Sequence, residues 1–149
     1  MYKRQGQEIS NQIKTQNIPI IVVESDEDRK KIAEDNGLEV LCADATLDET
    51  LKLAGLDKCK SLVVTLPNDA ANLYVVLSAK GIRSSIRVIA RAGTEEAASK
   101  LRLAGASIVV SPYIAAGRAM ASMALRPIAI DFLDLLACLL YTSPSPRDS

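Results

Sequence analysis

Two polar clusters each follow a short apolar segment that has the composition of a buried strand. Residues 43–46 (Ala-Asp-Ala-Thr) follow Leu38–Cys42, and residues 67–69 (Pro-Asn-Asp) follow Ser61–Leu66. In an open parallel sheet the carboxyl ends of the strands form one edge, and ligands bind at that edge. We therefore expect the two clusters to line one binding site.

Single charged residues end two further predicted strands, Ile18–Val23 and Ile86–Ala90. Glu24 lies roughly 20 residues after Gly6, a spacing at which an acid accepts hydrogen bonds from the ribose hydroxyls of an adenine nucleotide. Arg91 could pair with phosphate in a fork geometry. Each has an ordinary alternative, because Glu24 could be an exposed acid in the first turn of the next helix and a lone arginine is more often a surface ion-pair partner.

The remaining polar candidates are also open to two interpretations. Asp44 and Thr46 could hold adenine or ribose, or Asp44 could cap the helix that follows. Asn68 and Asp69 could lie beside ribose or phosphate, but Pro-Asn-Asp is also good turn and cap chemistry, which the residues alone favour. Gly6 fits the third glycine of Gly-x-Gly-x-x-Gly, whose role is close packing of a helix on a strand. The two other glycines and the first strand are expected to be missing.

Composition excludes several classes of protein. The 149 residues, 48% of them hydrophobic, predict one domain with one core. The 18 basic and 18 acidic residues are dispersed, which argues against binding to nucleic acid or an acidic membrane surface. No apolar stretch approaches the roughly 20 residues of a membrane span, and the N-terminus lacks a signal-peptide core. Three widely spaced cysteines and no histidine exclude the usual zinc sets and a histidine base, so we expect a soluble chain with cytosolic thiols.

The two ends of the chain share an unusual property at the level of DNA. Residues 1–5 can be encoded by GTG TAT AAG AGA CAG, and the reverse complement of this segment encodes Cys138–Thr142. The segment resembles a transposon-end adapter used to build sequencing libraries, and Ser143–Asp148 resembles its continuation. We therefore expect residues 1–5 and 138–149 to be adapter-derived, rather than part of a genuine disordered tail rich in proline and serine.

Strand and helix signals alternate along the interior of the chain with short connections. The predicted strands are Ile18–Val23, Leu38–Cys42, Ser61–Leu66, Ile86–Ala90 and Ala106–Val110. The predicted helices are Gly6–Thr15, a helix capped by Ser25 and stopped at Asn36-Gly37, Leu47–Ala54, Asp69–Lys80 stopped by Gly81, Glu95–Ala104 capped by Thr94, and Pro112 to about Leu125, interrupted at Arg126-Pro127. This order predicts βαβ units with right-handed crossovers.

In combination, several segments resemble the RCK domain, also called TrkA-N. They are Ile18–Glu24, Ala43–Thr46, Ser61–Leu73, Arg87–Ala92, Leu101–Ala106 and Val110–Pro112. The resemblance covers nearly all of residues 6–136, and the end of this stretch is similar to the crossover helix and linker of the ion-channel branch. It implies an α/β fold with a Rossmann-like parallel sheet and helices on both faces, here without its first strand. Residues 6–110 would form the nucleotide-binding domain, and residues 111–137 the crossover helix, which mediates dimerisation, and the linker.

Such domains are the cytoplasmic regulators of prokaryotic potassium channels and transporters, and they bind NAD(H), adenine nucleotides such as ATP and ADP, or in some members a divalent cation. The resemblance implies a nucleotide site lined by Gly6, Glu24, Asp44, Ala45, Thr46, Leu66, Asn68, Asp69 and Arg91. It also implies no enzymatic activity, and a homodimer through the crossover helix, with apolar surface from Ile114, Met120, Met123 and Leu125. In the full-length protein, such dimers would form a ring on a membrane subunit at the inner face of the plasma membrane.

The chain departs from the family pattern at two positions, and two rival interpretations remain open. Many relatives have Gly where this chain has Ala43. Many also have Glu where it has Tyr113, so a cation site is not expected at position 113.

One rival interpretation is the cofactor half of an NAD(P)-dependent oxidoreductase. It is disfavoured because the sequence has no histidine and no Tyr-x-x-x-Lys pair. The other is a fragment that binds nothing, because a missing strand between the strands at Ile18 and Ser61 leaves open sheet edges.

Overall fold

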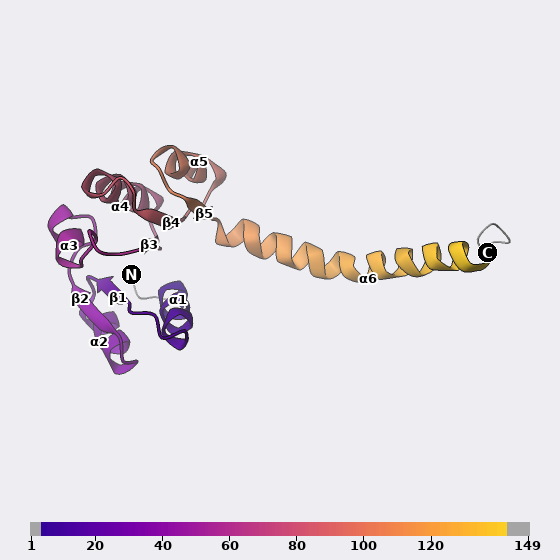
Figure 1. Ribbon diagram of the computed structural model, residues 1–149, viewed down its shortest axis with the longest axis horizontal. Coiled ribbons are helices and arrows are strands. Elements are labelled where there is room, and N and C mark those ends of the chain that lie inside the picture. The colour runs from indigo at the N-terminus through magenta and orange to yellow at the C-terminus, as the bar shows by residue number, and fades with distance from the viewer. Residues whose placement is uncertain (1–3, 143–149) are drawn as a thin grey trace. The chain divides into compact units, whose positions relative to one another are not determined.

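The computed structural model describes the backbone of residues 4–142 and the side chains of residues 5–127 (Figure 1). Residues 1–3 and 143–149, which belong to the segments expected to be adapter-derived, lie outside the described residues. The chain divides into two compact units, one ending at Ser111 and the other beginning at Pro112. Each unit is described by itself.

Helices and strands alternate along the first unit, and the described part of the second unit is one helix. The elements are α1 (Arg4–Thr15), β1 (Ile21–Glu24), α2 (Glu27–Asp35), β2 (Glu39–Cys42), α3 (Asp48–Leu53), β3 (Ser61–Val64), α4 (Asp69–Ile82), β4 (Arg87–Arg91), α5 (Glu95–Leu103), β5 (Ile108–Val110) and α6 (Pro112–Thr142). Every predicted strand and helix is present, which confirms the α/β class. The observed strands are shorter than predicted at one or both ends in most cases.

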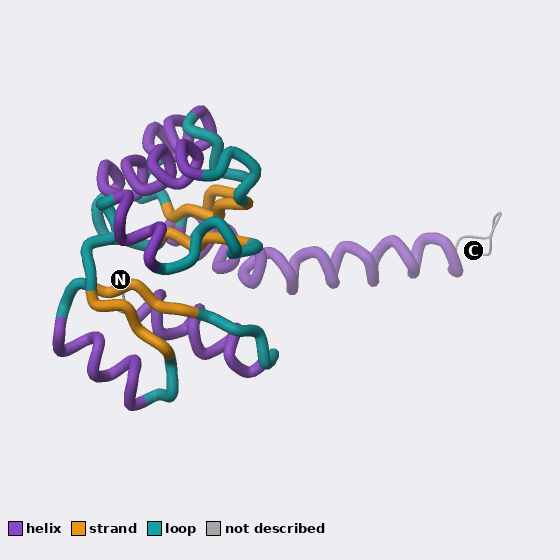
Figure 2. Tube along the Cα trace, turned by 60° about the vertical axis from the view of Figure 1, so that its left-hand side comes forward, coloured by secondary structure: helices purple, strands orange, loops and turns teal. Residues whose placement is uncertain are grey.

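All strand pairs are parallel, but the strands form two sheets rather than one (Figure 2). The first sheet pairs β1 with β2, and the second has the order β3-β4-β5. In a doubly wound sheet of order 3-2-1-4-5-6, these strands occupy every position except the first. The division between the sheets therefore falls where the sequence predicts that a strand is missing.

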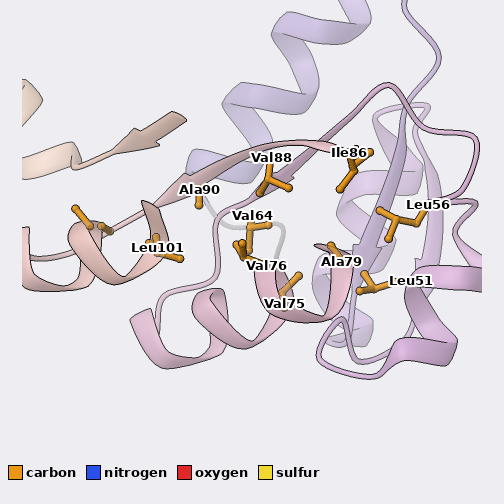
Figure 3. Packing of buried hydrophobic residues seen from close by; sticks show 12 residues of the cluster. Leu51, Leu56, Val64, Val75, Val76, Ala79, Ile86, Val88, Ala90 and Leu101 are labelled. Atoms are coloured by element: carbon orange, nitrogen blue, oxygen red, sulfur yellow. The ribbon is translucent and has the colours of Figure 1, made fainter. Parts of the chain in front are cut away.

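The larger core lies between the three-stranded sheet and the helices that pack on it (Figure 3). Strands β3 and β4 contribute Val64, Val88 and Ala90, and α4 contributes Val75 and Val76, all less than 5% exposed. Helix α5 packs beside α4 and adds Leu101. A smaller core of Val22, Ala33 and Leu38 joins β1, α2 and the start of β2. Burial of these side chains is the main stabilising contribution to both sheets.

The buried face of α4 does not include all of its large apolar residues. Leu73, Val76 and Leu77 are spaced to share one helical face, yet Leu77 is 53% exposed. The buried face instead carries Asn72, Val75, Val76 and Ala79, and Leu73 is half-buried at its margin. The helix is apolar on most of its circumference, so hydrophobic periodicity alone cannot select the buried face.

Helix boundaries give one confirmed cap and two corrections. Thr94 caps α5 as predicted, accepting a hydrogen bond from the amide of Ala97. Helix α2 is capped by Asp26 rather than Ser25, because the Asp26 carboxylate accepts a hydrogen bond from the amide of Arg29 at 3.0 Å. Helix α4 continues through Gly81 to Ile82, since a glycine weakens a helix without ending it.

The turn after α5 requires glycine. Gly105 has a φ of +107°, which side chains other than glycine rarely adopt. A Cβ atom at Gly105 would also lie 3.2 Å from Cε of Lys80. The Lys80 ammonium in turn donates a hydrogen bond to the carbonyl of Ile86 at 2.7 Å, so this corner joins α4, α5 and the start of β4.

The loop between α3 and β3 is held by one arginine from outside it. Arg83, the residue that follows α4, donates hydrogen bonds through Nη1 to the carbonyls of Leu56, Asp57 and Cys59. These carbonyls follow the last turn of α3, where helical partners have run out. A single guanidinium therefore satisfies three backbone acceptors at once.

Helix α6 differs from the sequence prediction. It was expected to be interrupted at Arg126-Pro127, but it runs from Pro112 to Thr142 with Pro127 inside it. Proline removes one backbone hydrogen bond and favours a kink, yet the helix continues past Pro127. Among residues 4–142, no helix combines the length and apolar content that crossing a membrane requires.

Candidate functional site

Glu24 ends β1 and is buried, with 2% of its surface exposed. Its Oε2 accepts a hydrogen bond from the amide of Asp26 at 3.1 Å, and its Oε1 lies 3.7 Å from Nη1 of Arg29. The first turn of α2 holds Glu27 and Asp28, so the alternative that Glu24 is an exposed first-turn acid is wrong. A ribose at Glu24 would share the carboxylate with the Asp26 amide, and that role stays a prediction.

Asp44 and Thr46 form a closed turn after β2. The Oδ1 atom of Asp44 accepts hydrogen bonds from the Thr46 hydroxyl at 2.7 Å and from the Thr46 amide at 2.9 Å. These two bonds lower the pKa of the Asp44 carboxyl below its usual value. The cap of α3 is Leu47, so the alternative that Asp44 caps this helix is wrong. Between the two bonded residues, Ala45 packs against the larger core.

The Asp44 turn makes a testable prediction about pH. Because folding lowers the pKa of Asp44, the turn stabilises the fold above the usual carboxyl pKa of about 3.9, and this contribution is lost as the pH falls through the lowered value. Replacing Thr46→Val removes the hydroxyl donor, so the pKa of Asp44 should rise toward its ordinary value. A ¹³C NMR titration of the Asp44 carboxyl carbon measures this change. Thr65→Val is the control, and an unchanged Asp44 pKa in Thr46→Val would contradict the prediction.

Asn68 and Asp69 begin α4 and both make structural hydrogen bonds. Asn68 caps the helix, as its Oδ1 accepts from the amide of Ala71 at 3.0 Å, which confirms the cap interpretation. Asp69 reaches the loop after β4, where its Oδ1 accepts a hydrogen bond from the amide of Gly93 at 2.8 Å. A Cβ atom on Gly93 would lie 3.1 Å from Oδ2 of Asp69, so the loop and the carboxylate are closely packed.

Asn72 is a polar residue of this region that sequence reasoning missed. It is fully buried, and its amide group accepts a hydrogen bond from the nitrogen of Leu66 and donates to the carbonyls of Leu66 and Arg91, at 2.9 to 3.1 Å. One side chain therefore joins the segment after β3 to the end of β4. One feature of the sequence could have indicated its role. Asn72 precedes Val75 by three residues and Val76 by four, so it lies on the same buried face of the helix.

Arg91 is the last residue of β4 and is half-buried. Within the side chains that the structure describes, its guanidinium has neither an ion pair nor a hydrogen bond. The alternative of a surface ion-pair partner therefore has no support among these residues. A guanidinium without a protein partner retains all its donors for a phosphate or carboxylate group.

The predicted residues fall into two hydrogen-bonded groups. At the end of the first sheet, the amide of Ala43 donates to the carbonyl of Glu24, which brings the Asp44 turn next to β1. At the end of the second sheet, Asn72 and Asp69 link the segment after β3 to the end of β4. Gly6 lies apart from both groups as a buried residue of α1, consistent with close helix packing.

A cavity of about 650 Å³ lies away from these residues, between α3 and α4. Its lining residues are Asp48, Lys52, Tyr74, Leu77, Ser78, Gly81 and Ile82. None of them is a predicted site residue. Among the described residues, no group of acidic, cysteine or histidine side chains could hold a metal ion.

Residues 2–112 match the TrkA-N domain family, which is most of the chain. The chain therefore belongs to this family, and the predicted RCK, or TrkA-N, membership is confirmed. Over 135 residues it is 38% identical to the probable potassium channel protein 2 of Methanocaldococcus jannaschii, which covers 89% of this chain and 39% of the relative. Potassium channel protein 1 of the same organism is 35% identical over 137 residues, covering 91% and 41%. The chain spans about two fifths of the length of these relatives.

Solved structures agree with the family assignment and with a Rossmann-like fold. The TrkA-N domain of the inner membrane protein YbaL from Escherichia coli superimposes with a TM-score of 0.79 at 27% identity, covering 83% of this chain and 91% of that chain. The GsuK channel bound to NAD gives a TM-score of 0.73 at 28% identity, covering 83% and 22%. GsuK bound to ADP gives the same TM-score and identity. Members of this fold at comparable similarity therefore bind NAD and ADP.

Proposed function

We propose that this chain is the nucleotide-sensing regulatory domain of a prokaryotic potassium channel or potassium transport system, acting at the cytoplasmic side of the membrane. The observation that carries the proposal is Arg91, a half-buried residue at the carboxyl end of a parallel strand whose guanidinium has no partner among the side chains of residues 5–127. Ligands bind parallel sheets at that edge. The binding of NAD and ADP by GsuK supports a ligand of this chemical class.

The residues fit NAD(H) or an adenine nucleotide such as ATP or ADP. In this proposal the Glu24 carboxylate accepts hydrogen bonds from ribose, Asp44 and Thr46 hold ribose or adenine, and Arg91 pairs with phosphate. The lowered pKa of Asp44 keeps its carboxylate ionised, which suits an acceptor of hydroxyl hydrogen bonds. The remaining residues of the proposed lining are Gly6, Ala45, Leu66, Asn68 and Asp69.

The proposal is tested by calorimetric titration of the chain with NADH and with ADP. Arg91→Gln should weaken both ligands about tenfold or more, because a charge-assisted hydrogen bond to phosphate is lost. Arg87→Gln is the matched control, since Arg87 is an exposed arginine at the opposite end of the same strand. Equal affinities for the two variants, or no binding by the unchanged chain, would contradict the proposal.

A hydride-transfer assay on the same samples separates regulation from catalysis. A regulatory domain binds NADH without turning it over, whereas the cofactor half of an oxidoreductase contributes to transfer. Oxidation of NADH that depends on Glu24 or Arg91 would favour the enzyme. We propose that the chain is not an enzyme, in agreement with its potassium-channel relatives.

We also propose that the chain acts as a homodimer through α6. Four of its residues expose large apolar surfaces, namely Tyr113 (71%), Met120 (69%), Met123 (67%) and Leu125 (57%), while the predicted contributor Ile114 is half-buried. Exposed apolar surface of this kind marks contact sites. Nucleotide binding would favour one arrangement of the dimer, and a ring of dimers on a membrane subunit would convert that preference into gating.

The proposed domain limits follow the sequence. Residues 6–110 form the nucleotide-binding domain, and residues 111–137 the crossover helix and linker. Residues 1–5 and 138–149 are proposed to be adapter-derived. Sequencing reads that continue residues 1–5 into genomic sequence would remove that last assignment.

A further inference from the structure

Asp69 and Asn72 lie one turn apart on the same side of α4, and both reach the segment that ends β4. Asp69 accepts a hydrogen bond from the amide of Gly93 at 2.8 Å, and Asn72 donates to the carbonyl of Arg91 at 3.1 Å. The two side chains thus hold the backbone at Arg91 and two residues after it, at Gly93. We call this pair the α4 clamp.

The clamped segment is fixed on its other sides as well. Ala92, between Arg91 and Gly93, is fully buried, and its amide donates a hydrogen bond to the carbonyl of Val110 on β5 at 2.9 Å. A Cβ atom on Gly93 would be in tight contact with the Asp69 carboxylate, 3.1 Å from its Oδ2. The backbone at Arg91 therefore has little conformational freedom, although the Arg91 guanidinium has no partner among the described side chains.

We propose that the α4 clamp positions Arg91 for the phosphate groups of the nucleotide, so that Asp69 acts as a positioning residue rather than as a ligand contact. This inference rests on the proposed nucleotide-binding function and changes the role predicted for Asp69. A carboxylate would repel phosphate if it faced the ligand directly. In the first turn of α4, with its Oδ1 bonded to a backbone amide, the charge of Asp69 is instead compensated by the helix N-terminus.

The sign of one effect distinguishes the two roles. Removing a carboxylate near an anionic ligand strengthens binding if the carboxylate acts only through its charge. Removing a residue that positions Arg91 weakens the binding of phosphorylated ligands such as ADP. It leaves the affinity for adenosine, which has no phosphate group, unchanged. The useful quantity is therefore the ratio of the dissociation constant for adenosine to that for ADP.

The experiment measures this ratio by calorimetry for the full chain and a set of variants. The unchanged chain should bind ADP about tenfold or more tightly than adenosine, and Arg91→Gln should bring the ratio near one. Asp69→Ala should lower the ratio by about three- to tenfold, with adenosine affinity changed less than about twofold. Asp69→Asn retains an oxygen acceptor for the Gly93 amide without the charge, so it should restore at least the original ratio.

Two further variants control for folding and for first-turn charge. Asp28→Ala removes an exposed acid from the first turn of α2 and should leave the ratio unchanged. Gly93→Ala places a Cβ atom 3.1 Å from Oδ2 of Asp69, so the carboxylate must shift slightly, and the ratio should fall by less than it does in Asp69→Ala, which provides a second measurement if Asp69→Ala fails to fold.

The outcomes separate this inference from the proposed function. If the unchanged chain binds neither ADP nor adenosine, both are wrong. If Arg91→Gln lowers the ratio but Asp69→Ala raises it or leaves it unchanged, the nucleotide site stands and the clamp is overturned. An equal loss of affinity for ADP and adenosine in Asp69→Ala would also overturn the clamp, because it would indicate general destabilisation.

Discussion

Replacing Leu101→Ala is expected to lower the free energy of unfolding by about 2–5 kcal/mol. Leu101 is fully buried on α5 and is among the largest side chains of the core beneath the three-stranded sheet. Its truncation removes apolar area from the core and leaves a cavity, because the neighbouring strands and α4 cannot close around it completely. Urea denaturation followed by circular dichroism measures the change.

Leu103→Ala is the matched control for this substitution. Leu103 lies two residues further along the same helix and is 88% exposed, so the same chemical change should alter stability by less than about 0.5 kcal/mol. Equal effects of the two substitutions would contradict the packing of α5 against the sheet.

Replacing Asn72→Leu is expected to cost about 3–5 kcal/mol, although leucine is apolar and of similar size. The substitution leaves three part-buried backbone groups without this partner, namely the amide and carbonyl of Leu66 and the carbonyl of Arg91. An unsatisfied buried polar group costs about 1–3 kcal/mol, and the three costs are not fully additive. The midpoint of urea denaturation reports the loss.

Asn11→Leu tests whether the effect arises from the hydrogen bonds. Asn11 is exposed on α1, so its replacement should change stability by less than about 0.5 kcal/mol. A stable Asn72→Leu variant would mean that the contact between the end of β3 and the end of β4 contributes little. Hydrogen exchange at the amide of Leu66 provides an independent measurement, because the substitution should increase its rate.

The order of the elements was predictable from the sequence because the strands are short apolar segments and several helices begin with capping residues. The segment Ile18–Val23 indicates a buried strand, and Thr94 followed by two acids indicates a helix start, which the Thr94 cap confirms. The division of the sheet was predictable for a different reason. Strand order in a doubly wound fold is constrained, so the position expected for the first strand of the fold is known, and the two sheets divide there.

Features that depend on tertiary contacts were not predictable. The buried face of α4 is decided by the strands beneath it, and leucine at 77 is as apolar as its buried neighbours. Ser25 and Asp26 are both good capping residues, and only the backbone geometry selects Asp26. Pro127 was expected to end a helix, but a proline can also be accommodated inside one.

The candidate site was predictable in its residue types but not in the partners of its side chains. Glu24 and Arg91 end their strands and Asp44 follows its strand, at the edge that the sequence indicates. Whether a polar side chain at this edge remains available to a ligand depends on residues far along the chain. Asp69, for example, is bonded to the amide of Gly93. Sequence spacing carries no information about such pairings, and this is also why Asn72 was missed.

Pro127 gives α6 a mechanical property that a helix of uniform sequence lacks. Proline has no N–H to donate to the carbonyl of Met123, so one backbone hydrogen bond is missing within the helix. A helix that lacks one backbone hydrogen bond bends most easily at that point. A force applied at one end of α6 would therefore bend the helix at Pro127.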